Sequence, residues 1–460
     1  MPTFSPSALL ACIENLVPRT SAELCVAYSG GLDSTVLLHS LARAIADRAN
    51  YRMRAAHVDH QLHPDSGSWR EQCSRVAQSL QIEFVPLVVT VAASPEASPE
   101  AAAREARYGA LRQILKPNEV LLTAHHADDQ LETMLFALMR GAGLRGLSGV
   151  PSLQIFGGGW LARPLLEFAR AELEEWARAE RLQWLEDPSN DNTRFDRNFL
   201  RHRVLPALRE RWPAVAHSAT RSTAHLREAG RLLDVLAAAD LETVAVGSCL
   251  DMTRLAGLAP ARRRNVLRHW IRQQGMRVPS TRKLATIERD LLIAREDRLP
   301  CVEWDGIQVR RHRGLLYCMR QRPPFEPADT LTWNVSQVLE LPAQLGRLRV
   351  QRDAVGGLAA ARLPAALQVH FRHGGEELQP AGDAHHRKLK KLLQDARVLP
   401  WWRDRVPLIY AADRLVAVAD LWIADEFAAR GGEDALRIVW EERPQLVAVG
   451  PNSFGHQESG

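Results

Sequence analysis

The chain has 460 residues, of which 46% are hydrophobic and 25% are charged, and its formal net charge at pH 7 is +5. This length exceeds one ordinary hydrophobic core, so we expect several domains. Because the sequence has no apolar run long enough to cross a bilayer and no export signal, it favours a cytoplasmic protein with no membrane partner. Six scattered cysteines without a CxxC pair argue against a disulfide framework or a thiolate metal site.

The first motif lies between an apolar run at 24–28 and a helical run that begins at Thr35, and it reads Ser29-Gly30-Gly31-Leu32-Asp33-Ser34. A strand, a glycine turn and a helix start place backbone N–H groups and a helix dipole where an anion would bind. The motif lacks the Lys-Ser/Thr pair of a Walker loop and the third glycine of a dinucleotide fingerprint, so both of these sites are disfavoured. Asp33 would repel a bare phosphate but would accept a bridging Mg²⁺. In the alternative reading, Asp33 and Ser34 only cap the helix.

Apolar runs alternate with helical patterns in the first part of the chain. We predict strands at 24–28, 53–58, 82–88 and 120–124, and helices that include 35–46, 69–80 and 127–139. This alternation is typical of an α/β fold with a Rossmann-like parallel sheet. Ligands of such sheets bind outside the carboxyl ends of the strands. The glycine loop, the motif 57–60 (His-Val-Asp-His) and the pair His125-His126 each follow a predicted strand, so we expect one shared crevice.

A flexible link at 93–99 leads into a predicted helix that carries Arg104, Arg107 and Tyr108. The segment 123–133 is rich in histidine and carboxylate side chains. Acidic residues in a first helical turn are favoured by the helix dipole alone, which is an alternative explanation for Asp128 and Asp129. A zinc hydrolase is disfavoured, because the chain has no HExxH spacing.

The rest of the chain changes character twice. A helix at 165–183 is broken at 186–190, a helix-rich stretch continues to 292, and a short β-like segment spans 302–319. A linker at 321–327 precedes alternating runs at 348–351, 368–372, 408–410 and 415–419. We therefore predict four parts of the chain: an N-terminal α/β domain at 1–215, a helix-rich middle domain at 216–325, a small C-terminal α+β domain at 326–445 and a loose tail at 446–460.

Basic residues gather in two places. One cluster is Arg194, Arg197, Arg201, Arg203, Arg209 and Arg211, and the other is Arg387, Lys388, Lys390, Lys391, Arg397, Arg403 and Arg405. Each cluster alone could be a solvated face. Trp401 and Trp402 lie within the second cluster, and they are either core residues or aromatic faces for RNA bases.

The glycine loop matches in full the SGGxDS loop of the pyrophosphate-releasing ATP enzymes, which cleave ATP to AMP and pyrophosphate. Within that group the chain closely resembles the tRNA(Ile)-lysidine synthase family. The resemblance is carried by the segments 57–62, 103–108, 123–133, 138–147, 163–166, 186–190, 197–202, 386–396 and 400–408. The chain departs from the family at Leu399-Pro400, where a proline pair is common, and at 372–377.

The resemblance implies a two-step reaction that uses ATP and Mg²⁺. The C2 oxygen of the wobble cytidine in the CAU anticodon of tRNA(Ile) attacks the α-phosphate of ATP, and pyrophosphate leaves. The ε-amine of free L-lysine then displaces AMP at C2 and gives lysidine. The second step needs an uncharged amine, whereas the reference pKa of lysine is about 10.4, so a nearby carboxylate or imidazole must take its proton.

The resemblance also implies roles for individual residues. The residues expected to bind the nucleotide are Ser29, Gly30, Gly31, Leu32, Asp33, Ser34, His57 and Asp59, and those expected to bind Mg²⁺ are Asp33 and Asp129. The expected catalytic residues are Asp33, Arg104, Arg107, His125 and Asp129. The expected tRNA contacts are Arg194, Arg197, Asn198, Arg201, Arg387, Lys388, Lys390, Lys391, Arg403 and Arg405. Three questions stay open: which arginine is catalytic, which residue deprotonates lysine, and whether the protein is a homodimer.

Two other functions remain to be weighed. An enzyme of the same fold could add sulfur to tRNA, but that chemistry depends on paired or reactive cysteines, and the sequence has no such pair. A tRNA-binding protein could use ATP only as a structural ligand, but Asp33, His125 and Asp129 together argue for catalysis.

Overall fold

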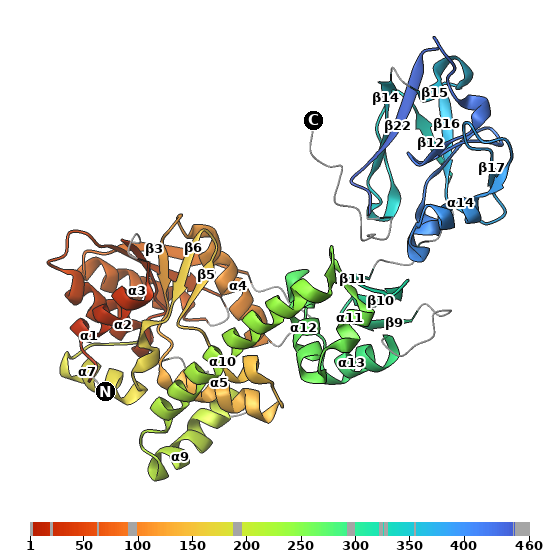
Figure 1. Cartoon of the computed structure of the whole chain (residues 1–460). Helices are drawn as coiled ribbons and strands as arrows, with labels where there is room; N and C mark the ends of the chain where they lie inside the picture. Colours follow the sequence, from red (N-terminus) through yellow and green to blue (C-terminus); the bar gives the residue numbers. More distant parts are fainter. Residues whose placement is uncertain are drawn as a thin grey trace. The chain divides into compact units, whose positions relative to one another are not determined.

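The computed structural model describes residues 3–18, 22–61, 64–90, 99–186, 196–291, 300–321, 325, 330–353, 356–444 and 446. The predicted link at 93–98, the predicted break at 187–190 and Arg194 lie outside these residues. The chain forms two compact units, Met1–Leu233 and Asp234–Gly460 (Figure 1).

A twisted sheet organises the first unit, with strand order β3-β2-β1-β4-β6-β5. All neighbours are parallel except β5 and β6, which form an antiparallel hairpin. The bounds are β1 Glu23–Ala27, β2 Arg52–Asp59, β3 Glu83–Val88, β4 Val120–Leu122, β5 Leu153–Phe156 and β6 Gly159–Ala162. The predicted parallel α/β fold is confirmed, and the four predicted strands match within two residues at their ends. The hairpin was missed, because strands of four residues show too little alternation to be recognised.

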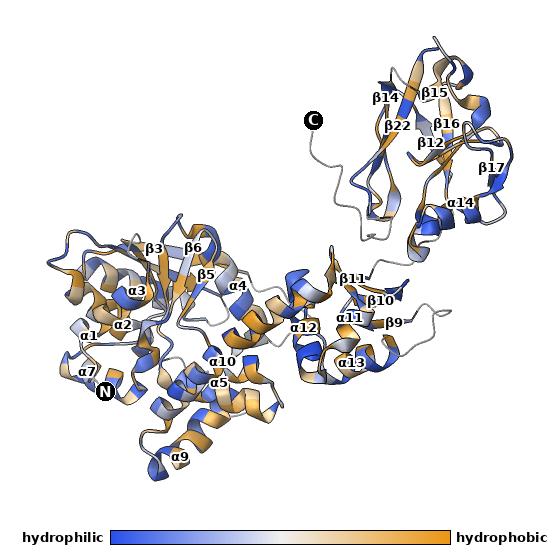
Figure 2. Ribbon diagram, viewed as in Figure 1, coloured by the Kyte–Doolittle hydropathy of each residue, from blue (hydrophilic) through white to orange (hydrophobic). Residues whose placement is uncertain are grey.

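Helices cover both faces of this sheet. Their bounds are α1 Pro6–Leu16, α2 Leu32–Ile45, α3 Ser66–Ser79, α4 Pro99–Ile114, α5 Ala127–Met139, α6 Leu144–Leu147, η1 Pro164–Glu167 and α7 Arg170–Ala179. Leu24 and Val26 of β1 pack in one core with α1, α2 and α7, whereas Cys25 packs in a second core with α4. The strand is buried on both faces, as expected for a parallel sheet. Figure 2 shows mixed colouring along the covering helices, as expected for amphipathic helices.

A second helical layer carries the first arginine cluster. It consists of α8 Asp196–Phe199, the π-helical turn η3 Leu200–Val204, α9 Leu205–Arg211 and α10 Val215–Val244, which extends into the second unit. Leu205 and Ala216 pack against Ala127 and Leu131 of α5 in one apolar cluster. This packing holds the arginine-bearing helices against the helix that follows β4.

The second unit has two cores. The first combines a sheet of order β7-β8-β11-β10-β9 with helices, and it is centred on Trp270. Its elements are β7 Ala245–Val246, β8 Cys249–Asp251, α11 Met252–Gly257, α12 Pro260–Gln273, α13 Thr281–Thr286, η4 Ile287–Leu291, β9 Cys301–Trp304, β10 Ile307–His312 and β11 Leu315–Arg320. The predicted β-like segment is therefore a three-stranded antiparallel stretch of this sheet.

The other core lies between two sheets, of order β12-β16-β19-β20-β21 and β13-β14-β22-β15, beside a small β17-β18 pair. The elements are β12 Leu331–Asn334, β13 Leu339–Glu340, η5 Pro342–Gln344, β14 Arg347–Asp353, β15 Leu358–Ala359, η6 Ala360–Arg362, β16 Ala366–His370, β17 Glu377–Leu378, β18 Arg387–Lys388, α14 Leu389–Asp395, η7 Pro400–Arg405, β19 Leu408–Ala411, β20 Arg414–Val418, β21 Trp422–Ile423, η8 Asp425–Phe427 and β22 Ala435–Glu441. This confirms the predicted C-terminal α+β fold. Leu446, which we placed in the tail, is buried, and its carbonyl accepts a hydrogen bond from the Leu399 amide at 2.8 Å.

Candidate active site

Three polar segments meet at the carboxyl edge of the first sheet. The glycine loop follows β1, the motif His57–His60 ends β2, and His125-His126 follows β4. The strand order runs outward from β1 in one direction through β2 and β3, and in the other through β4, so β1 and β4 flank the switch point of the sheet. Open α/β sheets bind ligands at this point. The topology therefore brings together the segments that the sequence analysis expected to share a crevice.

The two glycines of the loop serve different purposes. Gly30 has a φ of +85°, and an added Cβ would lie 2.5 Å from Leu185 Cδ1 and 2.8 Å from Cys73 Sγ. Gly31 has an ordinary φ of −70°, and the nearest atom to an added Cβ, Ser29 Oγ, would be 3.7 Å away. Gly30 is thus required by the fold itself. Nothing in the described protein requires Gly31, so its lack of a side chain leaves room for a ligand to approach the backbone.

The serines of the loop hold its shape. Ser34 Oγ donates to the carbonyl of Gly31 at 3.0 Å, accepts from the Ser29 amide at 3.3 Å and lies 3.0 Å from Ser29 Oγ. The side chain of Leu32 is buried in the core. Leu32 can therefore face a nucleotide only through its backbone, which lies in the first turn of α2. Gly31 caps this helix without a side-chain hydrogen bond, so the turn presents amide groups to an anion.

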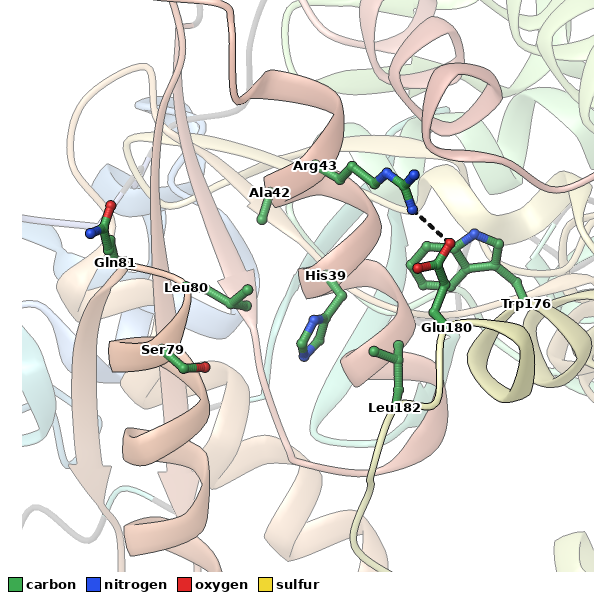
Figure 3. Close-up of a pocket in the computed structure, with 9 residues that line it drawn as sticks. All are labelled: His39, Ala42, Arg43, Ser79, Leu80, Gln81, Trp176, Glu180 and Leu182. Carbon is green, nitrogen blue, oxygen red and sulfur yellow. Dashed lines mark hydrogen bonds and ion pairs between the residues drawn. The ribbon is translucent and has the colours of Figure 1, made fainter.

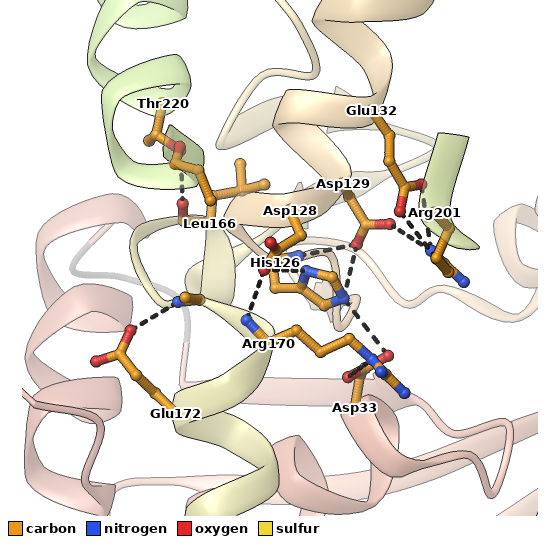
Figure 4. Close-up of polar contacts among 12 residues, drawn as sticks. Asp33, His126, Asp128, Asp129, Glu132, Leu166, Arg170, Glu172, Arg201 and Thr220 are labelled. Atoms are coloured by element: carbon orange, nitrogen blue, oxygen red, sulfur yellow. Dashed lines mark hydrogen bonds and ion pairs between the residues drawn. The ribbon is translucent and has the colours of Figure 1, made fainter. Parts of the chain in front are cut away.

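His126 is the centre of the acidic side of the crevice (Figure 4). Its ring is buried, with Nε2 3.6 Å from Asp33 and 3.5 Å from Asp129, and with Nδ1 3.7 Å from Asp128. Burial disfavours a charged imidazole, but the three carboxylates outweigh it and raise the pKa of His126 to about 9. His126 is therefore a cation at neutral pH that ties α5 to the glycine loop. The prediction from the sequence placed both histidines in the crevice but gave a catalytic role to His125.

Asp129 is held by backbone and arginine donors together. Its Oδ2 accepts from the His126 amide at 3.0 Å, and its Oδ1 faces Arg197 at 3.3 Å and Arg201 at 3.5 Å. Burial would raise the pKa of Asp129, but the positive charges of His126 and Arg197 hold it far below its usual range. Asp129 stays ionised at any pH at which the protein works.

Glu132, one turn further along α5, accepts hydrogen bonds from the same two arginines, Arg197 and Arg201. Arg197 Nε and Arg201 Nε each donate to Glu132 at 2.9 Å, and the Glu132 side chain is 2% exposed. Arg209 donates to Asp128 Oδ1 at 2.5 Å, while the Arg170 amide donates to Asp128 Oδ2 at 2.7 Å. The carboxylates of α5 thus offset most of the positive charge on Arg197, Arg201 and Arg209.

The described residues contain no group of three or more His, Cys, Asp or Glu side chains arranged to hold a metal ion. A Mg²⁺ ion in this crevice would therefore rely on one or two carboxylates, with phosphate oxygens and water completing its shell, as is usual for Mg²⁺. Asp33 fits such a role, because its Oδ1 is buried, makes no hydrogen bond to the described residues and faces the Arg170 guanidinium at the longer distance of 3.7 Å. Asp129 fits less well, because its oxygens already have donors.

The other predicted residues at this edge make specific contacts. His57 Nδ1 hydrogen-bonds the Tyr28 carbonyl at 2.9 Å, and Asp59 Oδ1 accepts from the Gln61 amide at 2.9 Å. His125 Nδ1 is 2.9 Å from Thr123 Oγ1, and burial lowers the pKa of His125 to about 4. His125 is therefore neutral at pH 7.

The two candidate catalytic arginines lie one turn apart on α4, and both are exposed. Arg104 lies over the Tyr108 ring, 5.1 Å from its centroid. Arg107 donates from Nε to His60 Nε2 at 3.1 Å. The two side chains are thus held by different partners.

Comparisons with known proteins cover almost the whole chain. Residues 7–208 match a PP-loop domain, residues 250–317 a TilS substrate binding domain, and residues 367–440 a TilS substrate C-terminal domain. The tRNA(Ile)-lysidine synthase of Coxiella burnetii is 41% identical over 430 residues, which is 94% of this chain and 95% of the relative. That of Alkalilimnicola ehrlichii is 41% identical over 443 residues, which is 96% and 98% of the two chains. The chain belongs to the tRNA(Ile)-lysidine synthase family.

A solved structure of a protein with another name aligns with about half of the chain. The U34-tRNA thiolase NcsA from Methanococcus maripaludis aligns with 48% of this chain and 78% of its own, at 15% identity and a TM-score of 0.41. This likeness carries no functional argument. In the protein described here, the six cysteines are free, and burial raises the pKa of each thiol to about 11 or 12. They stay protonated at neutral pH and are therefore poor nucleophiles.

Several residues of the second basic cluster make contacts within the protein. Arg403 Nε donates to the Val398 carbonyl at 3.0 Å, Arg405 lies over the Phe325 ring, and Arg387 pairs with Asp395 at 2.6 Å. The exposed members are Lys388, Lys390, Lys391 and Arg397. Trp402 is buried, so it is a core residue. Trp401 packs edge to face against Tyr317.

Five residues that build the crevice received no individual role from the sequence, namely His126, Asp128, Glu132, Arg170 and Arg209. Their common feature is a partner distant in sequence, such as Asp128 with Arg209. Only His126 carried a local signal, because it directly precedes the acidic first turn of α5 and takes the N-cap position.

A separate hollow of about 380 Å³ lies along the second half of α2, away from the glycine loop. Figure 3 shows His39, Arg43 and Glu180 among its lining residues, with the last two paired at 2.6 Å. It belongs to no segment that the family resemblance covers. Within the described ranges, no helix combines the length and the apolar character needed to cross a membrane.

Proposed function

We propose that the protein joins free L-lysine to C2 of the wobble cytidine in the CAU anticodon of tRNA(Ile), with ATP cleaved to AMP and pyrophosphate. Membership of the family, over nearly the whole length of the chain, establishes an ATP-dependent ligase that forms lysidine on tRNA(Ile). The observation that carries the catalytic assignment is the meeting of the glycine loop with Asp33, His126 and Asp129 at the switch point of the sheet. ATP and tRNA are intracellular substrates, so we place the reaction in the cytoplasm.

In the first step, the cytidine C2 oxygen forms a bond to the α-phosphorus while the bond to pyrophosphate breaks. Negative charge builds on the phosphate oxygens and must be met by fixed donors. We assign the pyrophosphate to the loop, through the amides that follow Ser29 and the first turn of α2. Arg104 and Arg107 steady the α-phosphate from α4. A Mg²⁺ ion held by Asp33, with Asp129 as a second carboxylate, would offset further charge on the phosphates.

In the second step, the lysine ε-nitrogen forms a bond to C2 as the bond from C2 to the AMP oxygen breaks. The attacking amine must lose a proton, because lysine is protonated at neutral pH. His125 is neutral, so a ring nitrogen has a lone pair for that proton, and Asp129 is ionised beside it. We assign proton acceptance to His125, with the ionised Asp129 beside it to stabilise the imidazolium that forms. The rise in the pKa of His126 makes that imidazole unsuitable as the base.

We propose that tRNA contacts both units. Arg197, Asn198 and Arg201 lie on the segment that borders the crevice, where their charge also organises Asp129 and Glu132. Arg203 and Arg211 are exposed on the same segment and suit phosphate contacts. The exposed lysines at the start of α14 would contact a more distant part of the tRNA. This scheme uses the three domains predicted from the sequence, at 1–215, 216–325 and 326–445.

The decisive experiment supplies the full chain with ATP, radiolabelled lysine and an unmodified tRNA(Ile) transcript with a CAU anticodon. We expect label in the tRNA only when ATP is present, with AMP and pyrophosphate as products. A transcript with uridine at the wobble position is the matched control, and it should take up no label. Pyrophosphate release without lysine incorporation would contradict the proposal. Label in the uridine control would contradict the cytidine assignment.

A further inference from the structure

One histidine of the motif at the end of β2 has no part in the reaction as assigned above. His60 Nε2 accepts a hydrogen bond of 3.1 Å from Arg107 Nε. An arginine Nε–H can only donate, so His60 Nε2 must carry a lone pair, and the ring proton of the neutral imidazole lies on Nδ1. The contact therefore specifies one tautomer of His60.

The backbone around His60 forms a local turn, and His60 Nδ1 is buried without a hydrogen-bond partner among the described residues. Asp59 is buried, and its Oδ1 accepts from the Gln61 amide, which closes a turn over His60. Gln61 adopts a left-handed φ of 54°, a conformation that needs such local support. Burial and the nearby charge of Arg107 lower the pKa of His60 to about 4, so the imidazole is neutral at physiological pH.

We infer that His60 is a positioning residue that fixes the guanidinium of Arg107 for the adenylation step. The inference rests on the proposed function, in which Arg107 steadies the α-phosphate. A long arginine side chain loses much rotamer freedom when it is held in one geometry. A hydrogen bond to Nε fixes the plane of the guanidinium and leaves its outer edge, with the two NH₂ groups, directed away from His60. An orientation set before the substrate binds favours the transition state.

The first test measures pyrophosphate release by the full chain with ATP and tRNA, in the absence of lysine. We expect His60→Ala to lower kcat about tenfold, the size of a lost hydrogen bond to a charged group, with little change in the KM for ATP. In an Arg107→Ala background, the same substitution should change the rate less than about twofold, because its target is gone. Equal losses in the two backgrounds would overturn the inference.

Two conservative variants sharpen this test. The amide oxygen of glutamine reaches the position of an imidazole Nε2, whereas that of asparagine reaches only the position of Nδ1. His60→Gln should therefore restore much of the rate, and His60→Asn should not. His39→Ala is the matched control: His39 is a half-buried histidine of the same unit that lines the separate hollow (Figure 3), and its loss should leave the rate unchanged. Equal rates for the glutamine and asparagine variants would contradict a role through Nε2.

A spectroscopic readout is independent of the reaction. In ¹⁵N spectra of the full chain, assigned by the loss of the signal in His60→Gln, His60 should show a protonated Nδ1 and an unprotonated Nε2 at pH 7. A protonated Nε2 would overturn the inference even if the enzyme makes lysidine. If the wild-type chain made no lysidine while His60 showed the expected tautomer, the proposed function would fail, but the contact with Arg107 would stand.

Discussion

The two adjacent glycines of the ATP loop offer a direct separation of folding from ligand binding. In Gly30→Ala, the new methyl group would lie 2.5 Å from Leu185 Cδ1 and 2.8 Å from Cys73 Sγ, at a φ of +85°. The left-handed conformation costs about 1–2 kcal/mol in a residue with a Cβ, and overpacking costs about 1–3 kcal/mol more. We expect the first unit to lose about 2–5 kcal/mol of stability, or roughly 4–20 °C in Tm.

Gly31→Ala should behave in the opposite way. Its φ of −70° suits alanine, and the nearest atom to the new methyl, Ser29 Oγ, is 3.7 Å away. The unliganded variant should match the wild type, or exceed it by about 0.4–1 kcal/mol, because alanine lowers the entropy of the unfolded chain. The methyl group would, however, occupy the space that a phosphate needs to reach the backbone, so ATP affinity should fall.

Thermal unfolding with and without ATP measures both effects. At an ATP concentration of 100 times the wild-type Kd, ligand binding should stabilise the wild type by about 2.7 kcal/mol. If Gly31→Ala weakens binding tenfold, this gain drops to about 1.4 kcal/mol, and at a hundredfold it drops to about 0.4 kcal/mol. An undiminished gain in Gly31→Ala would refute the phosphate site at this backbone position. A wild-type Tm in Gly30→Ala would refute the packing role.

Three further perturbations address other parts of the molecule. Asp33→Asn should lower pyrophosphate release by about 100-fold or more while tRNA affinity stays within about twofold, and near-normal turnover would exclude the metal role. Arg54 donates two hydrogen bonds of 2.6 Å to Glu119, and the two side chains are 9% and 1% exposed. Arg54→Met should lower the free energy of unfolding, measured by chemical denaturation, by about 3–5 kcal/mol, because it leaves the Glu119 carboxylate buried without its partner. Adding Glu119→Leu should recover much of this loss, and an additive loss would contradict the pairing. The exposed lysines of the second cluster can be neutralised together, by Lys388→Gln, Lys390→Gln and Lys391→Gln. This variant should bind tRNA more weakly, and the slope of its salt dependence should fall by about one unit per lost phosphate contact. Unchanged binding would show that these lysines only face solvent.

Local sequence was sufficient for the parts of this protein that depend on neighbours along the chain. The glycine loop, the strand before it and the helix after it are encoded in consecutive residues, and their backbone geometry follows from glycine conformation and apolar pattern. The placement of three polar segments at one edge also followed, because parallel strands joined by crossover helices share the direction of their carboxyl ends.

The electrostatics of the crevice were decided by tertiary structure alone. Whether His125 or His126 carries charge depends on burial and on Asp33, which lies nearly a hundred residues away. Three members of the arginine cluster that the sequence offered for tRNA, Arg197, Arg201 and Arg209, are paired with α5 carboxylates, because α9 packs against that helix through Leu205. A charge acts over the distances that the fold creates, and these distances cannot be read from spacing in the chain. Sequence therefore specified the ATP loop and its strand and helix, whereas only packing determined which side chains surround it and in which protonation state.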